Sequence, residues 1–130
     1  MYQAVTANIQ VTVEPRFLPE ESEPSSDRYF FAYSVEIANR GESVVQVRAR
    51  YWRITDGIGR VQEIRGAGVV GEEPVIHPGE SFRYTSGCPL ETPTGIMVGH
   101  YAVETLDGER FTIDIPAFSL DAPFADRTLN

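Results

Sequence analysis

The feature that most limits how this chain can fold is an alternation of apolar and polar residues with a period of two. The clearest runs are Val5–Val13, Tyr29–Ile37 and Phe111–Ile115, in which every second residue is apolar or aromatic. Side chains of a β-strand point alternately to its two faces, so each run predicts a strand with one buried face. No window of about eleven residues or more has the i, i+3, i+4 spacing of an amphipathic helix. The sequence therefore predicts an all-β protein.

Turn signals divide the chain into about seven or eight strands. Asn39–Gly41, His77–Glu80 and Asp107-Gly108 carry residues that favour tight turns. This number and spacing of strands predicts an immunoglobulin-like or fibronectin type III-like β-sandwich of antiparallel strands, and a closed barrel is the alternative. We expect a single domain over residues 1–130, with a core of about residues 5–120 and a tail over residues 121–130.

Prolines and a change of phase predict local details. Pro15 and Pro116 are expected to end strands, because proline lacks the N–H that a strand ladder uses. Ser86–Gly95, with two prolines and two glycines, is expected to be an irregular loop. Between Val45 and Ile54 the apolar positions change phase, which predicts a β-bulge or a switch between sheets. In the C-terminal segment three side chains are expected to anchor the chain by packing: Phe118, Leu120 and Phe124.

Charge and cysteine content narrow the class of protein. A net charge of −8 argues against a general nucleic-acid or anionic-membrane surface. The single cysteine, Cys88, excludes an internal disulfide and fits a reducing compartment. The first residues lack the pattern of a signal peptide, and no run approaches the roughly 20 apolar residues of a membrane span. We therefore expect a cytoplasmic protein that binds neither nucleic acid nor membranes.

A glycine-rich stretch is the most specific candidate for ligand binding. Gly66, Gly68 and Gly71 have the G-x-G-x-x-G spacing of dinucleotide-binding loops, and Arg65 precedes them. That pattern requires a helix to open from the loop, whereas Pro74 disfavours helical geometry at Glu73. Two interpretations stay open: a structural connection between strands, or a backbone nest that binds a nucleotide or pyrophosphate beside Arg65.

Other chemistry has weaker signals. The residues able to supply nitrogen or sulfur to a metal, His77, Cys88 and His100, lie in three separate segments without zinc-site spacing, so we expect no metal site. No nucleophile stands beside an evident base, so we expect no catalytic residues, no cofactor and no enzymatic activity.

An interaction surface is the remaining candidate. Arg48 and Arg50 are expected to share one strand face and, with Trp52, to form an interface for an acidic protein partner. An unpaired edge strand would also allow a homodimer.

Four motifs resemble those of the bacterial ApaG family. They are W-x-I-T-D at Trp52–Asp56, G-x-G-V-V-G-E-x-P at Gly66–Pro74, P-G-x-x-F-x-Y-x-S-G at Pro78–Gly87 and G-x-M-x-G-x-Y at Gly95–Tyr101. The motifs occur in the family's order, and the resemblance covers about Thr6 to Leu120.

The resemblance implies a fibronectin type III-like sandwich and a non-catalytic role in protein interaction. It also implies an association with tolerance of cobalt and magnesium, or with the metabolism of dinucleotide polyphosphates. The alternative function is a nucleotide or pyrophosphate sensor that uses Gly66–Gly71.

Overall fold

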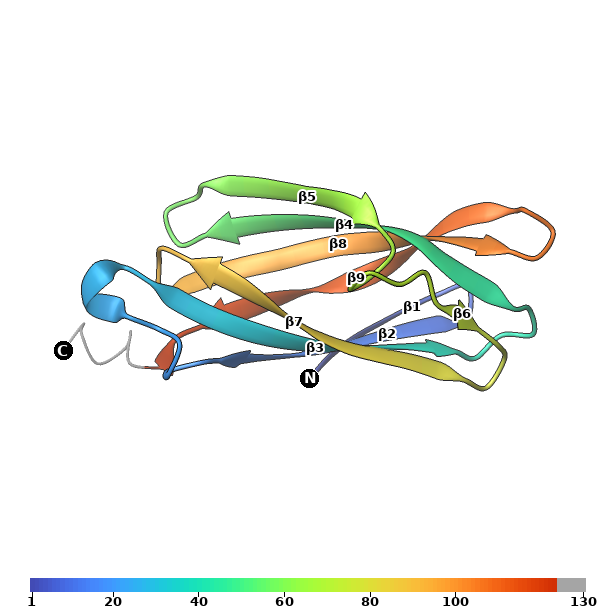
Figure 1. Ribbon diagram of the computed structural model, residues 1–130, viewed down its shortest axis with the longest axis horizontal. Helices are drawn as coiled ribbons and strands as arrows, with labels where there is room; N and C mark the ends of the chain where they lie inside the picture. The colour runs from blue at the N-terminus through green and yellow to red at the C-terminus, as the bar shows by residue number, and fades with distance from the viewer. Residues whose placement is uncertain (124–130) are drawn as a thin grey trace.

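In the described part of the chain, nine strands form two antiparallel sheets packed face to face (Figure 1). The computed structural model describes residues 1–123 of the 130-residue chain. One sheet has the order β1-β2-β3-β7, and the other has the order β5-β4-β8-β9 with the short β6 also paired to β4. The strands are β1 (Tyr2–Thr6), β2 (Ile9–Phe17), β3 (Tyr29–Asn39), β4 (Val45–Asp56), β5 (Val61–Ala67), β6 (Val75–Ile76), β7 (Ser81–Leu90), β8 (Thr94–Thr105) and β9 (Arg110–Asp121), with one 3-10 turn, η1 (Pro24–Ser26). The predicted all-β sandwich is confirmed.

The core lies between the sheets and is filled by residues that the alternation placed on the inner faces. Tyr33, Trp52 and Phe118 meet at its centre, where Trp52 makes edge-on ring contacts at 5.2 Å with Tyr33 and 5.9 Å with Phe118. Around them lie fully buried aliphatic side chains from both sheets: Val11, Val13, Val35, Ile37, Val47, Val103, Ile113 and Leu120. Phe118 and Leu120 are therefore packing anchors as expected, whereas Phe124 lies outside the described residues.

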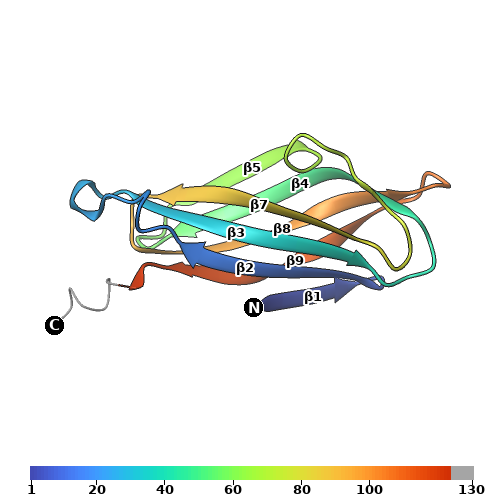
Figure 2. The same cartoon turned by 60° about the horizontal axis from the view of Figure 1, so that its bottom comes forward.

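Strand β9 of one sheet packs against β2 and β1 of the other, on the side opposite β5 (Figure 2). Asp114 N donates to Thr6 Oγ1 at 3.1 Å, and Tyr2 Oη lies 3.1 Å from Ser119 Oγ. In the described part of the chain no backbone ladder joins β1 to β9 or β7 to β5. The alternative of a closed barrel is therefore wrong.

The predicted first strand is in fact a hairpin. The alternation over Val5–Val13 suggested one strand, but Ala7 and Asn8 have positive φ values of 49° and 65° and form a two-residue turn. Both central residues of a type I′ hairpin need positive φ, and asparagine tolerates it better than most residues. Because the reversal carries no glycine, the composition gave no turn signal there. Val5 consequently lies 63% exposed on β1.

Three prolines lie inside strands rather than ending them. Pro89 and Pro116 belong to β7 and β9, which are edge strands where one side needs no ladder partner. Pro15 lies in β2 beyond Val13, the last residue that pairs with β1. The expected irregular loop Ser86–Gly95 is therefore mostly strand, because β7 continues to Leu90.

A bulge in β4 sets which side chains reach the candidate site. The pairing with β8 shifts register between Val47 and Ala49, so Arg48 is the extra residue. Before the bulge Val45 and Val47 are buried, and after it Trp52 and Ile54 are. The predicted change of phase is confirmed as a bulge. The bulge leaves the Arg48 side chain on the outward face of the sheet. It directs the Arg50 side chain to the inward face, the same face as Trp52.

Within residues 1–123 no helix is long and apolar enough to cross a membrane.

Candidate functional site

The glycine-rich stretch forms the end of one strand and a tight turn. Gly66 lies within β5 and pairs with Arg50. Val69 and Glu72 exchange two backbone hydrogen bonds of 2.8 and 2.9 Å around Val70 and Gly71. These central residues have positive φ values of 43° and 80°, the signs of a type I′ turn. No helix follows, so the structure lacks the dinucleotide-binding geometry.

Each glycine has a structural reason for lacking a side chain. Gly68 has φ +58°, and a Cβ there would overlap the carbonyl oxygen of Glu72. Gly71 supplies the positive φ of the turn. A Cβ on Gly66 would lie 2.8 Å from the guanidinium of Arg50, which occupies the space above it. The G-x-G-x-x-G spacing therefore arises from three separate packing and backbone requirements.

Part of the backbone of this stretch forms internal hydrogen bonds. Gly68 N donates to Arg48 O and Val69 N donates to Glu72 O, both at 2.8 Å. Arg50 Nη1 donates to Ala67 O at 2.9 Å and Gly68 O at 3.1 Å. An anion-binding nest needs consecutive free N–H groups. Gly68 N and Val69 N are therefore not available to form such a nest.

Arg65 points away from the glycines. Its guanidinium carbon lies 4.7 Å from the ring centre of Tyr51, and Nη2 lies 3.5 Å from Glu63 Oε2. Its side chain is 71% exposed. Tyr51 also donates to Glu63 at 2.7 Å, and this hydrogen bond raises the pKa of the tyrosine hydroxyl. Arg65 thus belongs to a charged and aromatic cluster on the sheet surface rather than to a glycine loop.

The expected interface of Arg48, Arg50 and Trp52 is not assembled. Trp52 is only 2% exposed and lies in the core. Arg48 is paired at 3.2 Å with Glu73. Because of the bulge, Arg48 and Arg50 do not share a face of the sheet. The Arg50 side chain is held in place by hydrogen bonds to backbone oxygens. The error came from continuing the period of two across an extra residue.

Histidine and cysteine side chains do not converge. His77 contacts Glu80 in a surface turn, whereas His100 stacks on Tyr51 with ring centres 4.9 Å apart. Cys88 is 3% exposed, and burial raises the pKa of its thiol to about 11. Among the described residues no group of three or more His, Cys, Asp and Glu is placed to hold a metal ion.

A polar network inside the sandwich accounts for three tyrosines. Tyr84 and Tyr101 join their hydroxyls by a hydrogen bond, and burial raises the pKa of both. Burial also raises the pKa of Tyr33 despite a hydrogen bond with Ser86. These hydroxyls have partners inside the protein, so we assign the network to stability.

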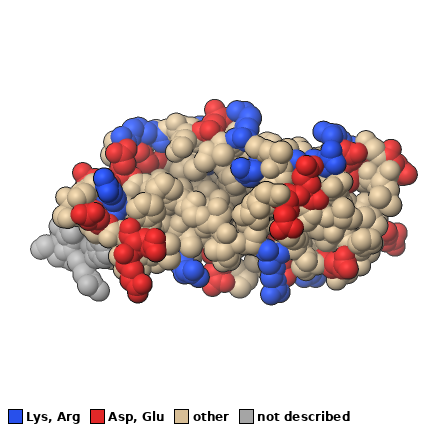
Figure 3. All heavy atoms as spheres, viewed as in Figure 1, with Lys and Arg blue, Asp and Glu red and all other residues tan. Residues whose placement is uncertain are grey.

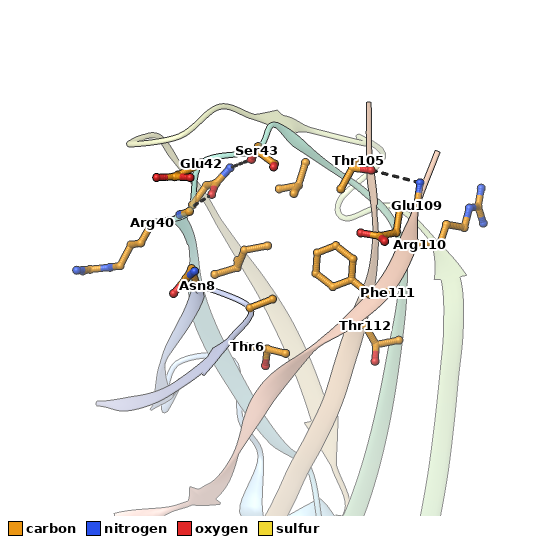
Figure 4. A pocket seen from close by; sticks show the side chains of 15 residues that line it. Thr6, Asn8, Arg40, Glu42, Ser43, Thr105, Glu109, Arg110, Phe111 and Thr112 are labelled. Carbon is orange, nitrogen blue, oxygen red and sulfur yellow. Dashed lines mark hydrogen bonds between the residues drawn. The ribbon is translucent and has the colours of Figure 1, made fainter. Parts of the chain in front are cut away.

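One end of the sandwich contains an open cavity of about 1030 Å³ (Figure 4). Three loops surround it, those of the β1–β2 hairpin, the β3–β4 connection and the β8–β9 hairpin. The ring of Phe111 points into it, whereas the side chains of Arg40 and Arg110 extend away from it. Nearby Asn39, although buried, bonds to Ser43 O and Ile76 O. The side-chain amide of Asn39 therefore holds the β3–β4 connection against β6.

The outward face of the β5-β4-β8-β9 sheet is the feature that sequence reasoning missed. Three aliphatic side chains there are exposed: Val61 by 50%, Ile96 by 53% and Val98 by 37%. Thr55 pairs with both Val61 and Ile96, so these residues form one row across the sheet. The row Arg65–Tyr51–His100 lies nearby on the same face. The outward phase of each strand was readable from the alternation, but which strands adjoin was not.

Acidic and basic side chains are interspersed on the face shown in Figure 3 and form no large patch of one charge. The net charge of −8 is consequently no guide to a single charged site.

Comparison with known proteins agrees with this architecture. A sequence profile of the ApaG domain matches residues 19–105. The chain is 61% identical over its full length to protein ApaG of Methylorubrum extorquens and 56% identical to protein ApaG of Parvibaculum lavamentivorans, and it covers all of each. A crystal structure of an ApaA protein from Bordetella pertussis, 50% identical, superposes with a TM-score of 0.87 over 92% of this chain and 98% of that one. With profile, full-length relatives and fold in agreement, the chain belongs to the ApaG family.

Proposed function

We propose that this protein is a non-catalytic interaction module that binds a protein partner through the outward face of the β5-β4-β8-β9 sheet. The observation that carries the proposal is the row of exposed aliphatic side chains beside the Arg65–Tyr51–His100 stack. Exposed aliphatic and aromatic groups held on a rigid sheet lose little side-chain freedom on binding. Tyrosine and arginine, here Tyr51 and Arg65, are enriched among the few residues that supply most of the energy of protein interfaces.

The face combines apolar area with fixed charge. Val98 is exposed by 37% and pairs across the ladder with Arg53, which in turn pairs with Glu63. Tyr51 is held between Arg65 and His100, so its ring is presented in one orientation. A protein surface with apolar side chains and a carboxylate near Arg53 would be complementary to this arrangement.

The cellular setting of this binding is a further part of the proposal. The resemblance to the ApaG family implies tolerance of cobalt and magnesium or the metabolism of dinucleotide polyphosphates. We place the partner in one of these processes, in the cytoplasm. On this view the module regulates another protein and performs no chemistry of its own.

Site-specific photo-crosslinking in living cells tests the proposed face. A photoreactive amino acid at position 98 should capture a defined protein, and Val98→Glu should reduce affinity for that purified protein at least tenfold. Val5→Glu is the matched control, because Val5 is an equally sized exposed side chain on the other sheet. An equal loss of affinity in Val98→Glu and Val5→Glu, or equal cross-linking from position 5, would contradict the proposal.

Ligand titration separates this role from the sensor alternative. We expect no rise in melting temperature with millimolar pyrophosphate or diadenosine tetraphosphate. A ligand that binds only the folded state must raise it. A rise that Arg65→Ala abolishes would instead support an anion site at the glycine-rich stretch.

A further inference from the structure

We propose that β5 is a self-association edge, through which two copies of this chain pair antiparallel about Ile64 to join their sheets. The partner is a second copy, and the pairing uses the strand edge rather than the sheet face. Arg65 belongs to both surfaces, but pairing along the edge does not require the function proposed above.

β5 is the outermost strand of its sheet and is covered by little else. Its only ladder partner is β4, and its other edge is unpaired within the described residues. Five of its seven residues are exposed, and only Ile64 and Gly66 are partly buried. An open strand edge of this kind is a template for another strand.

The hydrogen bonds that flank β5 show which of its residues face the open edge. Gly68 N donates to Arg48 O and Asp56 N donates to Arg60 O, both within the register that pairs Arg50 with Gly66. Antiparallel ladders use alternate residues, so the even-numbered residues of β5 bond to β4. The N–H and C=O groups directed to the open edge are those of Val61, Glu63, Arg65 and Ala67.

The charges on these residues specify one register. Pairing about Ile64 sets Glu63 of each copy opposite Arg65 of the other, with Val61 opposite Ala67. A shift by two residues sets Glu63 opposite itself in one direction and Arg65 opposite itself in the other. Opposite charges directly across a ladder stabilise it and like charges destabilise it. In a register shifted by one residue, the edge-facing residues of one copy would lie opposite residues of the other copy whose N–H and C=O groups already bond to β4.

The same register gives a two-fold interface, in which the same patch on both copies is used. Ile64 meets its own counterpart on the inner face, as a close pair without ladder hydrogen bonds. Arg50 already donates to Ala67 O, so pairing is centred on the two Glu63–Arg65 pairs. The self-complementary charge sequence is the reason to assign a second copy rather than an unrelated peptide.

Charge reversal tests the pairing by sedimentation of the full chain at concentrations up to about 1 mM. The natural chain should dimerise, and Glu63→Arg or Arg65→Glu alone should shift it to monomer. An equimolar mixture of these two variants should form a heterodimer, and the double variant should dimerise again. Glu36→Arg, which breaks an exposed ion pair with Arg83 on the other sheet, is the control and should leave association unchanged.

Disulfide trapping provides a measurement that does not depend on charge. Ile64→Cys should cross-link to its counterpart on oxidation, whereas Val61→Cys should not, because Val61 faces Ala67. The natural Cys88 is buried and does not compete.

Three results would overturn the proposal: a natural chain that stays monomeric, a dimer that survives both single reversals, or equal cross-linking at positions 61 and 64. Val98→Glu should leave dimerisation intact, so failure of the face proposal and failure of the edge proposal are distinguishable.

Discussion

Replacing Gly68 with alanine tests whether the glycine-rich stretch is structural. Gly68 has φ +58°, where an L-residue costs about 1 to 2 kcal/mol. Its Cβ would also overlap the carbonyl oxygen of Glu72, a backbone atom held by the hydrogen bond from Val69 N. Forcing atoms into an occupied position adds about 1 to 3 kcal/mol. We expect Gly68→Ala to lower the free energy of unfolding by about 2 to 5 kcal/mol.

The other two glycines of the motif supply graded controls for that measurement. Gly71 has φ +80° with open space around it, so Gly71→Ala should cost only about 1 kcal/mol. At Gly66 a new Cβ meets the end of the flexible Arg50 side chain, so Gly66→Ala should cost less than about 1 kcal/mol.

Urea unfolding followed by tryptophan fluorescence gives the three values, because the only tryptophan, Trp52, lies in the core. The expected order of destabilisation is Gly68, then Gly71, then Gly66. Equal effects at the three positions, or a loss below about 0.5 kcal/mol for Gly68→Ala, would refute the structural explanation of the motif.

Three further predictions follow from single side chains. Val70→Asn should raise the free energy of unfolding by about 0.5 to 1 kcal/mol in urea, because a β-branched residue at φ +43° is strained and Asn-Gly suits a type I′ turn; a loss of stability would contradict this. Trp52→Ala should cost about 3 to 5 kcal/mol, as expected of a buried aromatic and not of an interface residue; a change below 1 kcal/mol would place Trp52 outside the core. The Cys88 thiol has a pKa of about 11 in the folded protein, against an ordinary value of 9.0. Between about pH 9 and 11 the thiol ionises only in the unfolded chain, so its contribution to the free energy of unfolding is complete below pH 9 and is lost over that range. Relative to Cys88→Ala, the natural chain should lose about 2 to 3 kcal/mol across that range, and parallel pH profiles of the two proteins would exclude the linkage.

The glycine motif illustrates the limit of local spacing as evidence for a site. The positions of Gly66, Gly68 and Gly71 are the same in both interpretations, and only Pro74 and the absence of helical periodicity argue against a helix. The structural reasons come from Arg50 and Glu72, which are placed against the glycines by the pairing of β4 with β5 and by the turn. Contacts across strands are not encoded in the spacing of one segment.

The interface prediction failed for a related reason. Extending one alternation through β4 predicts a shared interface for Arg48, Arg50 and Trp52, although the apolar positions of this strand change phase. The position of the bulge decides which arginine faces outward, and it was fixed by pairing with β8. The change of phase itself was visible, but its location was not.

The sequence by itself determined the all-β class, the buried faces of most strands and the family resemblance, because the period of two and the turn residues are local properties of the chain. It did not determine that Pro89 and Pro116 lie inside strands, because only the order of strands in a sheet makes a strand an edge. The tertiary structure alone decided that Val61, Ile96 and Val98 meet on one face and that β5 is left unpaired. Both candidate binding surfaces depend on which distant strands become neighbours. That choice is made by the packing of the two sheets and not by any one segment.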